Sequence, residues 1–263
     1  MRADKEQQSD SEDLAYDGGK LRLFVPDLLA EGAKVAPDEG QTHYLLHVMR
    51  AREGTRVLLF NGRDGEWRAE VSGVTKRSCE LRCERQTRQQ EGVPDLWLAF
   101  APIKKTPSDY VAQKATELGV AVLQPVITNR TIARRVNLDR LRANAIEAAE
   151  QSERLSVPDI SEPLSLTQLL QRWPAERHIL FCDEGGDAAP ILGALSRAGR
   201  GPWGILTGPE GGFDPAERAL IRSHALVTPV TLGPRIMRAD TAALAALAVW
   251  QAVLGDWGHT PGL

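Results

Sequence analysis

The spacing of hydrophobic and polar residues divides the chain into two parts. In the first, LRLFV and SCELRCE are typical of strands, and TRVLLFNGRDGEWRAEVSGV predicts two strands joined by a glycine-rich hairpin. Before this hairpin, DEGQTHYLLHVMRA has one apolar side and predicts a helix. We therefore expect a small β-barrel with one helix over residues 20–90.

Strands and helices alternate in the second part. The segment QTRQQEGVPD, residues 86–95, is polar, contains glycine and proline, and predicts a linker. After it, strand-like runs alternate with helix-like runs; the strand-like runs are LWLAFA, VAVLQPVIT, HILFCD, WGILTG and LVTPVTLG. This order predicts an α/β domain over residues 91–263, with a parallel sheet covered by helices on both faces.

Charge is unevenly distributed along the chain. The net charge is −3, but residues 1–19 alone carry −4, which leaves the rest close to neutral. We expect this acidic, polar segment to be disordered. A nearly neutral body with local basic clusters argues against a general DNA-coating protein and permits an enzyme that selects particular RNAs.

The sequence gives no reason to expect a membrane protein or a metalloprotein. No apolar run is long enough to cross a bilayer, and the N-terminus has no signal-peptide pattern, which favours the cytoplasm. Cys79, Cys83 and Cys182 lack CxxC spacing, so we expect neither a disulfide nor a zinc site, and we expect Cys79 and Cys83 to be buried. His43 and His47 have a metal-ligand spacing without a carboxylate or cysteine partner, and we expect no metal there.

Two glycine-bearing loops are the strongest indication of a ligand site. GPEGGF (residues 208–213) and LGPRIMR (residues 232–238) each follow a predicted strand and precede a helix. Ligands bind at the carboxyl ends of parallel strands, and glycines allow close approach to backbone groups. Neither the G-x-G-x-x-G pattern nor a phosphate-gripping P-loop is present, which favours a ligand recognised by main-chain hydrogen bonds, such as an adenine edge. The alternative is that both loops are only tight turns.

The two loops with their flanking residues resemble a known family. LTGPEGGFDPAE followed by VTLGPRIMRADTAALAAL resembles the C-terminal signature of the RsmE family, uracil-N3 methyltransferases of small-subunit ribosomal RNA. QKATELGV, AAEQSERLSVP, RLFV and HYLLHVMRAREG extend the resemblance over nearly everything beyond residue 20. Where the family usually reads Arg-Thr-Glu-Thr-Ala, this chain has Arg238-Ala239-Asp240-Thr241-Ala242.

The resemblance implies a fold, a cofactor and partners. It implies a SPOUT-type parallel sheet with a C-terminal deep trefoil knot, preceded by a PUA-like RNA-binding domain. The cofactor would be S-adenosyl-L-methionine, the substrate U1498 of 16S ribosomal RNA in the 30S subunit, and the assembly a homodimer.

The predicted cofactor residues lie in the two glycine-bearing loops and beside them. They are Leu206, Thr207, Gly208, Pro209, Glu210, Gly211, Gly212, Leu232, Gly233, Ile236, Met237, Arg238 and Ala242. Two of these are also candidate catalytic residues, because uracil N3 must lose its proton before it attacks the methyl group. Glu210 would contact the cofactor or assist proton removal, unless it is only a charge at a helix N-terminus. Arg238 would stabilise the negative uracil, or else contact a phosphate or a dimer partner.

Basic residues on both parts are candidates for RNA contact. The set comprises Arg22, Arg50, Lys104, Lys105, Lys114, Arg130, Arg134, Arg135 and Arg154. Because most surface arginines are simply solvated, we expect only some of them to touch phosphate. Three other functions remain open: methylation of another RNA site, methylation of a ribose 2′-oxygen, and a non-catalytic role as an RNA-binding ribosome-assembly factor.

Overall fold

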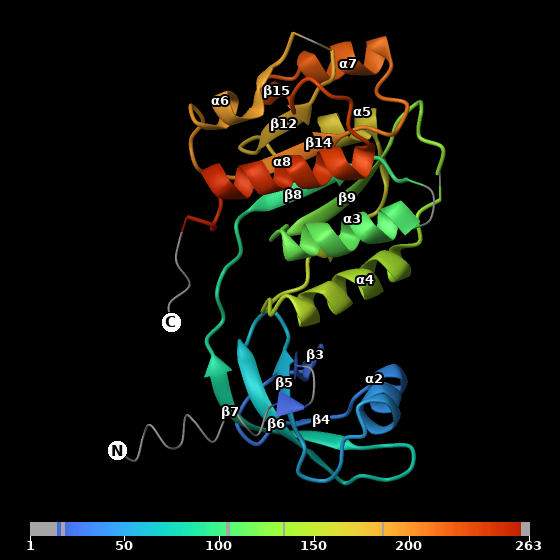
Figure 1. The fold of residues 1–263 in the computed structure, drawn as a ribbon, viewed down its shortest axis with the longest axis vertical. Coiled ribbons are helices and arrows are strands. Elements are labelled where there is room, and N and C mark those ends of the chain that lie inside the picture. The colour runs from blue at the N-terminus through green and yellow to red at the C-terminus, as the bar shows by residue number, and fades with distance from the viewer. Residues whose placement is uncertain (1–14, 17–18, 104–105, 134, 186, 259–263) are drawn as a thin grey trace. The chain divides into compact units, whose positions relative to one another are not determined.

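The computed structural model describes residues 15–16, 19–103, 106–133, 135–185 and 187–258 (Figure 1). They belong to two compact units, one of residues 1–92 with 149–157 and one of residues 93–148 with 158–263. The predicted acidic tail lies mostly outside the described residues. Where the tail ends, β1 (Ala15–Tyr16) pairs antiparallel with β2 (Gly19–Lys20).

The first unit is built on a five-stranded sheet of order β3-β5-β6-β7-β4. β3 and β5 run parallel and the remaining neighbours antiparallel. The strands are β3 (Arg22–Phe24), β4 (Lys34–Val35), β5 (Arg56–Phe60), β6 (Glu66–Ser72) and β7 (Glu80–Arg88). β7 continues into the predicted linker, because its last residues still pair with the start of β6. Cys79 and Cys83 are buried in the core of this unit, as expected.

The predicted helix of the first unit consists of two types of turn. α2 (Glu39–His43) begins with a capping box between Asp38 and Gln41, and continues into a π-helix, η1 (Tyr44–Val48). Leu45 is fully buried in the core of the unit. The wider π turn ends before Arg50, whose φ of 55° lies in the left-handed region.

The second unit contains an eight-stranded sheet whose pairings are all parallel, as the alternation of strands and helices predicts. Its central order is β9-β8-β14-β12-β15. These strands are β8 (Leu96–Phe100), β9 (Val122–Ile127), β12 (His178–Cys182), β14 (Trp203–Thr207) and β15 (Val227–Thr231). The short strands β10 (Asp159–Ile160) and β11 (Leu164–Ser165) pair with β9, and β13 (Ala189–Pro190) pairs with β15.

Helices cover both faces of this sheet. Leu96, Leu98 and Phe100 point into one hydrophobic core, while Ala99 packs into the core on the opposite face. This alternation follows from the two-residue period of a strand. The first core takes residues from α3 (Thr106–Glu117), α4 (Leu138–Gln151), α6 (Ile191–Leu195) and α8 (Ala239–Val253); the second takes them from α5 (Leu166–Gln171) and α7 (Pro215–Arg222). Figure 1 shows α3 and α8 crossing the same face.

The strand order brings three connecting loops together. β12 lies between β14 and β15, and all three strands run parallel. The loops that leave their carboxyl ends therefore emerge side by side, at residues 183–185, 208–214 and 232–238. Parallel α/β sheets bind ligands at this edge. No helix in the described part of the chain is long and apolar enough to cross a membrane.

Candidate functional site

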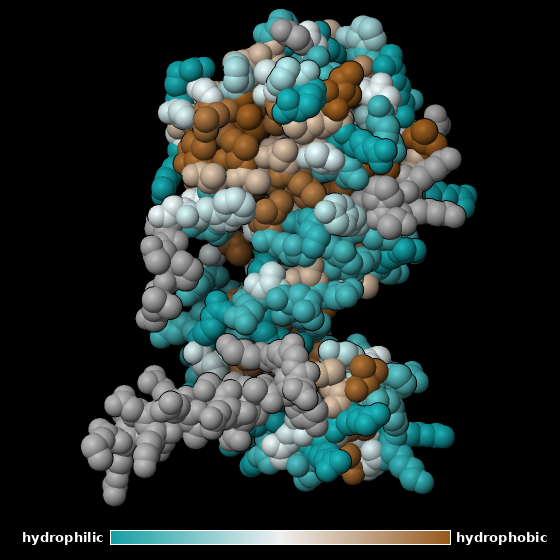
Figure 2. All heavy atoms as spheres, viewed as in Figure 1, coloured by the Kyte–Doolittle hydropathy of each residue, from teal (hydrophilic) through white to brown (hydrophobic). Residues whose placement is uncertain are grey.

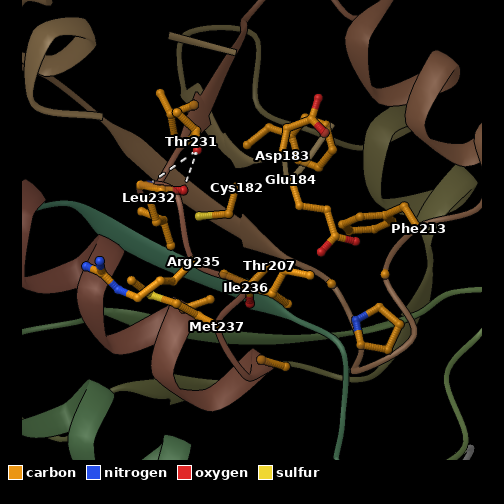
Figure 3. Close-up of a pocket in the computed structure, with 18 of the residues that line it drawn as sticks. Cys182, Asp183, Glu184, Thr207, Phe213, Thr231, Leu232, Arg235, Ile236 and Met237 are labelled. Atoms are coloured by element: carbon orange, nitrogen blue, oxygen red, sulfur yellow. Dashed lines mark hydrogen bonds between the residues drawn. The ribbon is translucent and has the colours of Figure 1, made fainter. Parts of the chain in front are cut away.

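The three loops enclose a cavity of about 210 Å³ (Figure 3). Most of the predicted cofactor residues line it. They are Thr207, Gly208, Pro209, Glu210, Gly212, Leu232, Gly233, Ile236, Met237 and Ala242. The two glycine-bearing loops thus form one cavity rather than two separate turns.

Three predicted cofactor residues do not line this cavity. Leu206 is 1% exposed, and its side chain packs in the core beneath the sheet edge. Gly211 faces away, because a Cβ placed on it would lie 3.5 Å from side-chain carbons of Arg130. Arg238 is the exposed N-cap of α8 and makes no side-chain capping bond there.

The first glycine loop is tightly built. A Cβ on Gly208 would lie 2.7 Å from the Phe213 ring, and that ring packs edge-on against Phe181 at 5.3 Å. Gly212 has a φ of +65°, and a Cβ there would overlap the carboxylate of Glu184. These glycines are required by close approach as well as by backbone conformation.

Polar contacts hold the middle and the last residue of this loop. The Arg130 Nη1 donates to the Gly211 carbonyl at 2.7 Å. Asp214 caps α7 through a capping box with Glu217. The amide side chain of Asn129 donates to Asp214, whose pKa lies below its ordinary value chiefly because of this bond and the Glu217 backbone N–H. The loop after β9 therefore supports the loop after β14.

The second glycine loop is open by comparison. Gly233 has a φ of +117°, and a Cβ on it would meet no described atom within 4 Å. The hydroxyl of Thr231 accepts from the Gly233 N–H and donates to its carbonyl, both at 3.3 Å. Ile236 is 91% exposed although it lines the cavity. Figure 3 shows this loop with Leu232, Arg235 and Met237 on the side of the cavity across from Phe213.

The third loop was not predicted as part of the site. It contributes Asp183 and Glu184 to the cavity wall, together with Cys182 from the end of β12 and Arg218 from α7. The available signal was the strand HILFCD, which ends in an acid at the same sheet edge as the two glycine loops.

Asp183 anchors this third loop to α7. The carboxylate is 3% exposed and accepts from the Arg218 Nε at 2.8 Å, the Arg222 Nε at 2.7 Å and the Gly185 N–H at 3.0 Å. Asp187 pairs with the same two guanidinium groups, each at 2.7 Å. We call these four side chains the arginine clamp: Asp183, Asp187, Arg218 and Arg222.

Ionisation in the cavity wall follows from these contacts. Burial acts to raise the pKa of Asp183, but the hydrogen bonds from Arg218, Arg222 and Gly185 outweigh it and hold the pKa below 3.8. Burial raises the pKa of the Cys182 thiol to about 12, so this thiol stays protonated at neutral pH. The clamp is therefore charged, and Cys182 is a neutral part of the wall.

The cavity has the features that S-adenosyl-L-methionine requires. Leu232, Ile236 and Met237 offer apolar surface for an adenine ring, and the glycines expose main-chain groups that can read its edge. Glu184 supplies an acceptor for hydroxyl or ammonium donors. The residues present thus fit the proposed cofactor.

One predicted RNA contact is wrong. Arg22 is 5% exposed, and its guanidinium pairs with Glu66 at 2.9 Å. The same group donates to the carbonyls of Ala149, Glu150 and Arg154, where α4 ends. A cation beside the unpaired carbonyls of a helix C-terminus is a structural contact, and this one leaves no surface for phosphate.

The other predicted RNA contacts have varied surroundings. Arg50, Arg130 and Arg135 are exposed. Lys114 pairs with Glu117, which is the first cause of its raised pKa, and Arg154 is half-buried. Lys104, Lys105 and Arg134 lie outside the described residues. His43 and His47 have their rings 5.1 Å apart, and no group of three or more metal ligands occurs in the described ranges.

Comparison with known proteins gives consistent matches over both units. Residues 90–251 match the family described as RNA methyltransferase domain, and residues 37–83 match the RNA methyltransferase PUA domain. Ribosomal RNA small subunit methyltransferase E of Rickettsia conorii is 33% identical over 229 residues, which cover 86% of this chain and 93% of the relative. The protein of that name from Synechocystis is also 33% identical, over 95% of this chain and 82% of its own length.

Solved structures agree with these matches. Ribosomal RNA small subunit methyltransferase E from Neisseria gonorrhoeae, bound to S-adenosyl methionine, has a TM-score of 0.82 at 30% identity and covers 90% of this chain and 99% of its own. A methyltransferase from Legionella pneumophila, solved with the bound cofactor SAM, has a TM-score of 0.80 at 28% identity and covers 90% and 98%.

Proposed function

This chain belongs to the ribosomal RNA small subunit methyltransferase E family, and we propose that it methylates N3 of U1498 in 16S ribosomal RNA. It is an S-adenosyl-L-methionine-dependent ribosomal RNA methyltransferase; the atom and the nucleotide are the proposal. The observation that carries the proposal is the single cavity formed by the loops after β14 and β15, whose residues also carry the family resemblance.

The reaction replaces the N3 proton of uracil with a methyl group. The bound cofactor supplies an electrophilic methyl on a sulfonium; a carbon–nitrogen bond forms, the carbon–sulfur bond breaks, and neutral S-adenosylhomocysteine leaves. The N3 proton must pass to an acceptor before N3 attacks the methyl group. Holding N3 in line with the methyl and sulfur is a large part of the catalytic effect.

Two residues of the chain are proposed for the reacting end of the cavity. Glu210 is exposed and lines the cavity, which suits a group that contacts the cofactor or receives the N3 proton. Arg238 stands next to the lining residue Met237 at the start of α8, from where its guanidinium can reach a negatively charged uracil. A phosphate or dimer contact is the alternative for Arg238.

The target nucleotide must leave its stack to reach this cavity. Uracil N3 lies on the base-pairing edge and is accessible only in an unpaired or flipped nucleotide. The exposed arginines Arg50, Arg130 and Arg135 are proposed to hold the surrounding phosphates. We place the protein with its substrate, the small ribosomal subunit, in the cytoplasm.

We also propose the homodimer and the C-terminal trefoil knot that the family resemblance implies. Apolar side chains remain uncovered on the second unit: Leu192 is 60% exposed and Ile236 is 91% exposed, and Leu244 and Val249 on α8 are partly exposed. Figure 2 shows hydrophobic side chains gathered on this unit beside α6 and α8. A second copy covering this surface would account for it.

The test is methyl transfer from labelled S-adenosyl-L-methionine to small subunits that lack the modification, with naked 16S RNA in parallel. Nuclease digestion and mass spectrometry of the product should place the label on a uracil base at position 1498. Label on a ribose or at another nucleotide would overturn the proposed specificity. No label at all, with the cofactor bound, would indicate the non-catalytic assembly factor.

A further inference from the structure

The carboxylate of Glu184 is directed into the cofactor cavity (Figure 3). Glu184 lines the cavity and is exposed, and no hydrogen bond or ion pair joins its carboxylate to any residue that the structure describes. Figure 3 shows this carboxylate turned inward between Phe213 and Thr207, across the cavity from Leu232 and Met237. An acceptor that faces a cavity and is not used by the described residues is available to a ligand that brings hydrogen-bond donors.

Two features hold Glu184 in this position. The preceding residue, Asp183, is fixed by Arg218 and Arg222, one on each carboxylate oxygen. On the other side Glu184 packs against Gly212, where any Cβ would overlap its carboxylate. The loop after β12 and the loop after β14 therefore both determine where the acceptor points.

The donors of an S-adenosyl compound are few. They are the adenine amino group, the two ribose hydroxyls and the ammonium of the methionine end. An adenine held against Leu232, Ile236 and Met237 would have its edge read by main-chain groups of the glycine loops. The ribose is joined directly to the adenine, so its hydroxyls are the first donors beyond the apolar wall.

We propose that Glu184 binds the ribose of the cofactor, its carboxylate accepting hydrogen bonds from the 2′- and 3′-hydroxyls. A carboxylate can accept one bond on each oxygen, which matches a vicinal diol. This inference rests on the proposed function, because it takes the cavity to be the cofactor site. It assigns a specificity residue to the loop after β12, which lies outside the two glycine loops.

The test measures binding of three cofactor analogues by calorimetry, without RNA, to the full chain and to Glu184→Gln. S-adenosylhomocysteine has both ribose and amino-acid end, 5′-methylthioadenosine lacks the amino-acid end, and its 2′,3′-dideoxy form lacks the hydroxyls. We expect Glu184→Gln to weaken the first two by a similar factor, about 10- to 100-fold, and to leave the weaker binding of the dideoxy form unchanged. The matched control is Glu176→Gln, an exposed glutamate of the same unit outside the cavity.

Each other outcome overturns the inference in a distinct way. A loss confined to S-adenosylhomocysteine would assign Glu184 to the ammonium, and an equal loss for all three analogues would assign it to the adenine or to the shape of the wall. Unchanged binding would remove it from recognition altogether. If the wild-type chain bound none of the analogues, the proposed function itself would fail; thermal unfolding of Glu184→Gln checks that the variant is folded.

Discussion

The two glycine loops form one cavity but are built in opposite ways. In the loop after β14, Phe213 fills the space above Gly208, Arg130 holds the Gly211 carbonyl, and a capping box fixes the exit into α7. In the loop after β15, a Cβ on Gly233 would touch nothing described, and Ile236 is almost fully exposed. The loop after β14 is therefore a preformed wall of the cavity, whereas the loop after β15 makes few contacts within its own unit.

This difference indicates how the site divides its tasks. A preformed wall lowers the ordering cost of binding, because its geometry is already fixed before the ligand arrives. An open loop can adjust to the cofactor, to the uridine or to a second copy, and gains its contacts only when they bind. Four predictions test this division, from the largest expected effect to the smallest.

Gly212→Val should disrupt the preformed wall, which is the loop after β14. The residue sits at a φ of +65°, where a β-branched side chain is strained, and its Cβ would displace Glu184. We expect S-adenosylhomocysteine to bind roughly 30- to 1000-fold more weakly, from about 2–4 kcal/mol of strain and overpacking. Calorimetry measures this. The matched control is Gly211→Val, one residue earlier, which faces Arg130 and not the cavity; if it were equally damaging, the loop as a whole and not its inner face would be responsible.

Asp183→Asn should destabilise the second unit, which contains the cofactor cavity. Removing this buried charge leaves Arg218 and Arg222 facing a neutral amide, and since both are partly exposed we expect a loss of about 2–3 kcal/mol in the free energy of unfolding at pH 7. Because the folded pKa of Asp183 is lowered, its contribution is present above pH 3.8 and is lost as the pH falls through that lower pKa. Urea unfolding should therefore show the gap between wild type and variant closing below pH 3.8. A constant gap would contradict the clamp.

Ile236→Ser tests whether the open loop depends on a second copy. With 91% of the side chain exposed, the substitution should change the unfolding free energy of the isolated chain by less than about 0.5 kcal/mol. If the partner subunit covers it, dimerisation should weaken by about 2 kcal/mol, or roughly 30-fold. Urea unfolding measures the stability of the chain, and sedimentation over a concentration series measures the monomer–dimer equilibrium. An unchanged association would exclude Ile236 from the interface.

Arg130→Ala should slightly loosen the preformed wall formed by the loop after β14. It removes the 2.7 Å bond to the Gly211 carbonyl at an exposed position, so we expect cofactor affinity to fall by about 1 kcal/mol, roughly fivefold. If Arg130 also meets a phosphate, the slope of log affinity for RNA against log salt should decrease by about 1. The two readouts separate its roles: loss in the first alone would leave Arg130 a support of the loop.

The pattern of strands, helices and glycines was sufficient to predict the parallel sheet and to locate both glycine loops. It could not give the strand order. β14 lies between β8 and β12 in the sheet, although it follows both of them in the chain and is consecutive with neither. The third loop was missed for a related reason. The arginines that fix Asp183 lie 35 and 39 residues later in the chain, so no local pattern connects them to this loop.

Arg22 shows the opposite error, a basic residue assigned to RNA from its charge alone. Among its carbonyl partners, Ala149 is the nearest in sequence, and it lies 127 residues away. Nothing in the sequence around Arg22 indicates that contact. Burial is set by the fold, whereas charge is visible in the sequence. Arginines that serve folding and arginines that serve binding therefore cannot be separated before the tertiary structure is known.

The same arginine has a consequence for synthesis. The first unit includes residues 149–157, and the buried Arg22–Glu66 pair reaches its full set of acceptors only when the carbonyls of Ala149, Glu150 and Arg154 are present. A nascent chain that has emerged only to residue 92 would hold this cation against an incomplete lining. We therefore expect the first unit to complete its folding during translation only after residue 154 has left the ribosome.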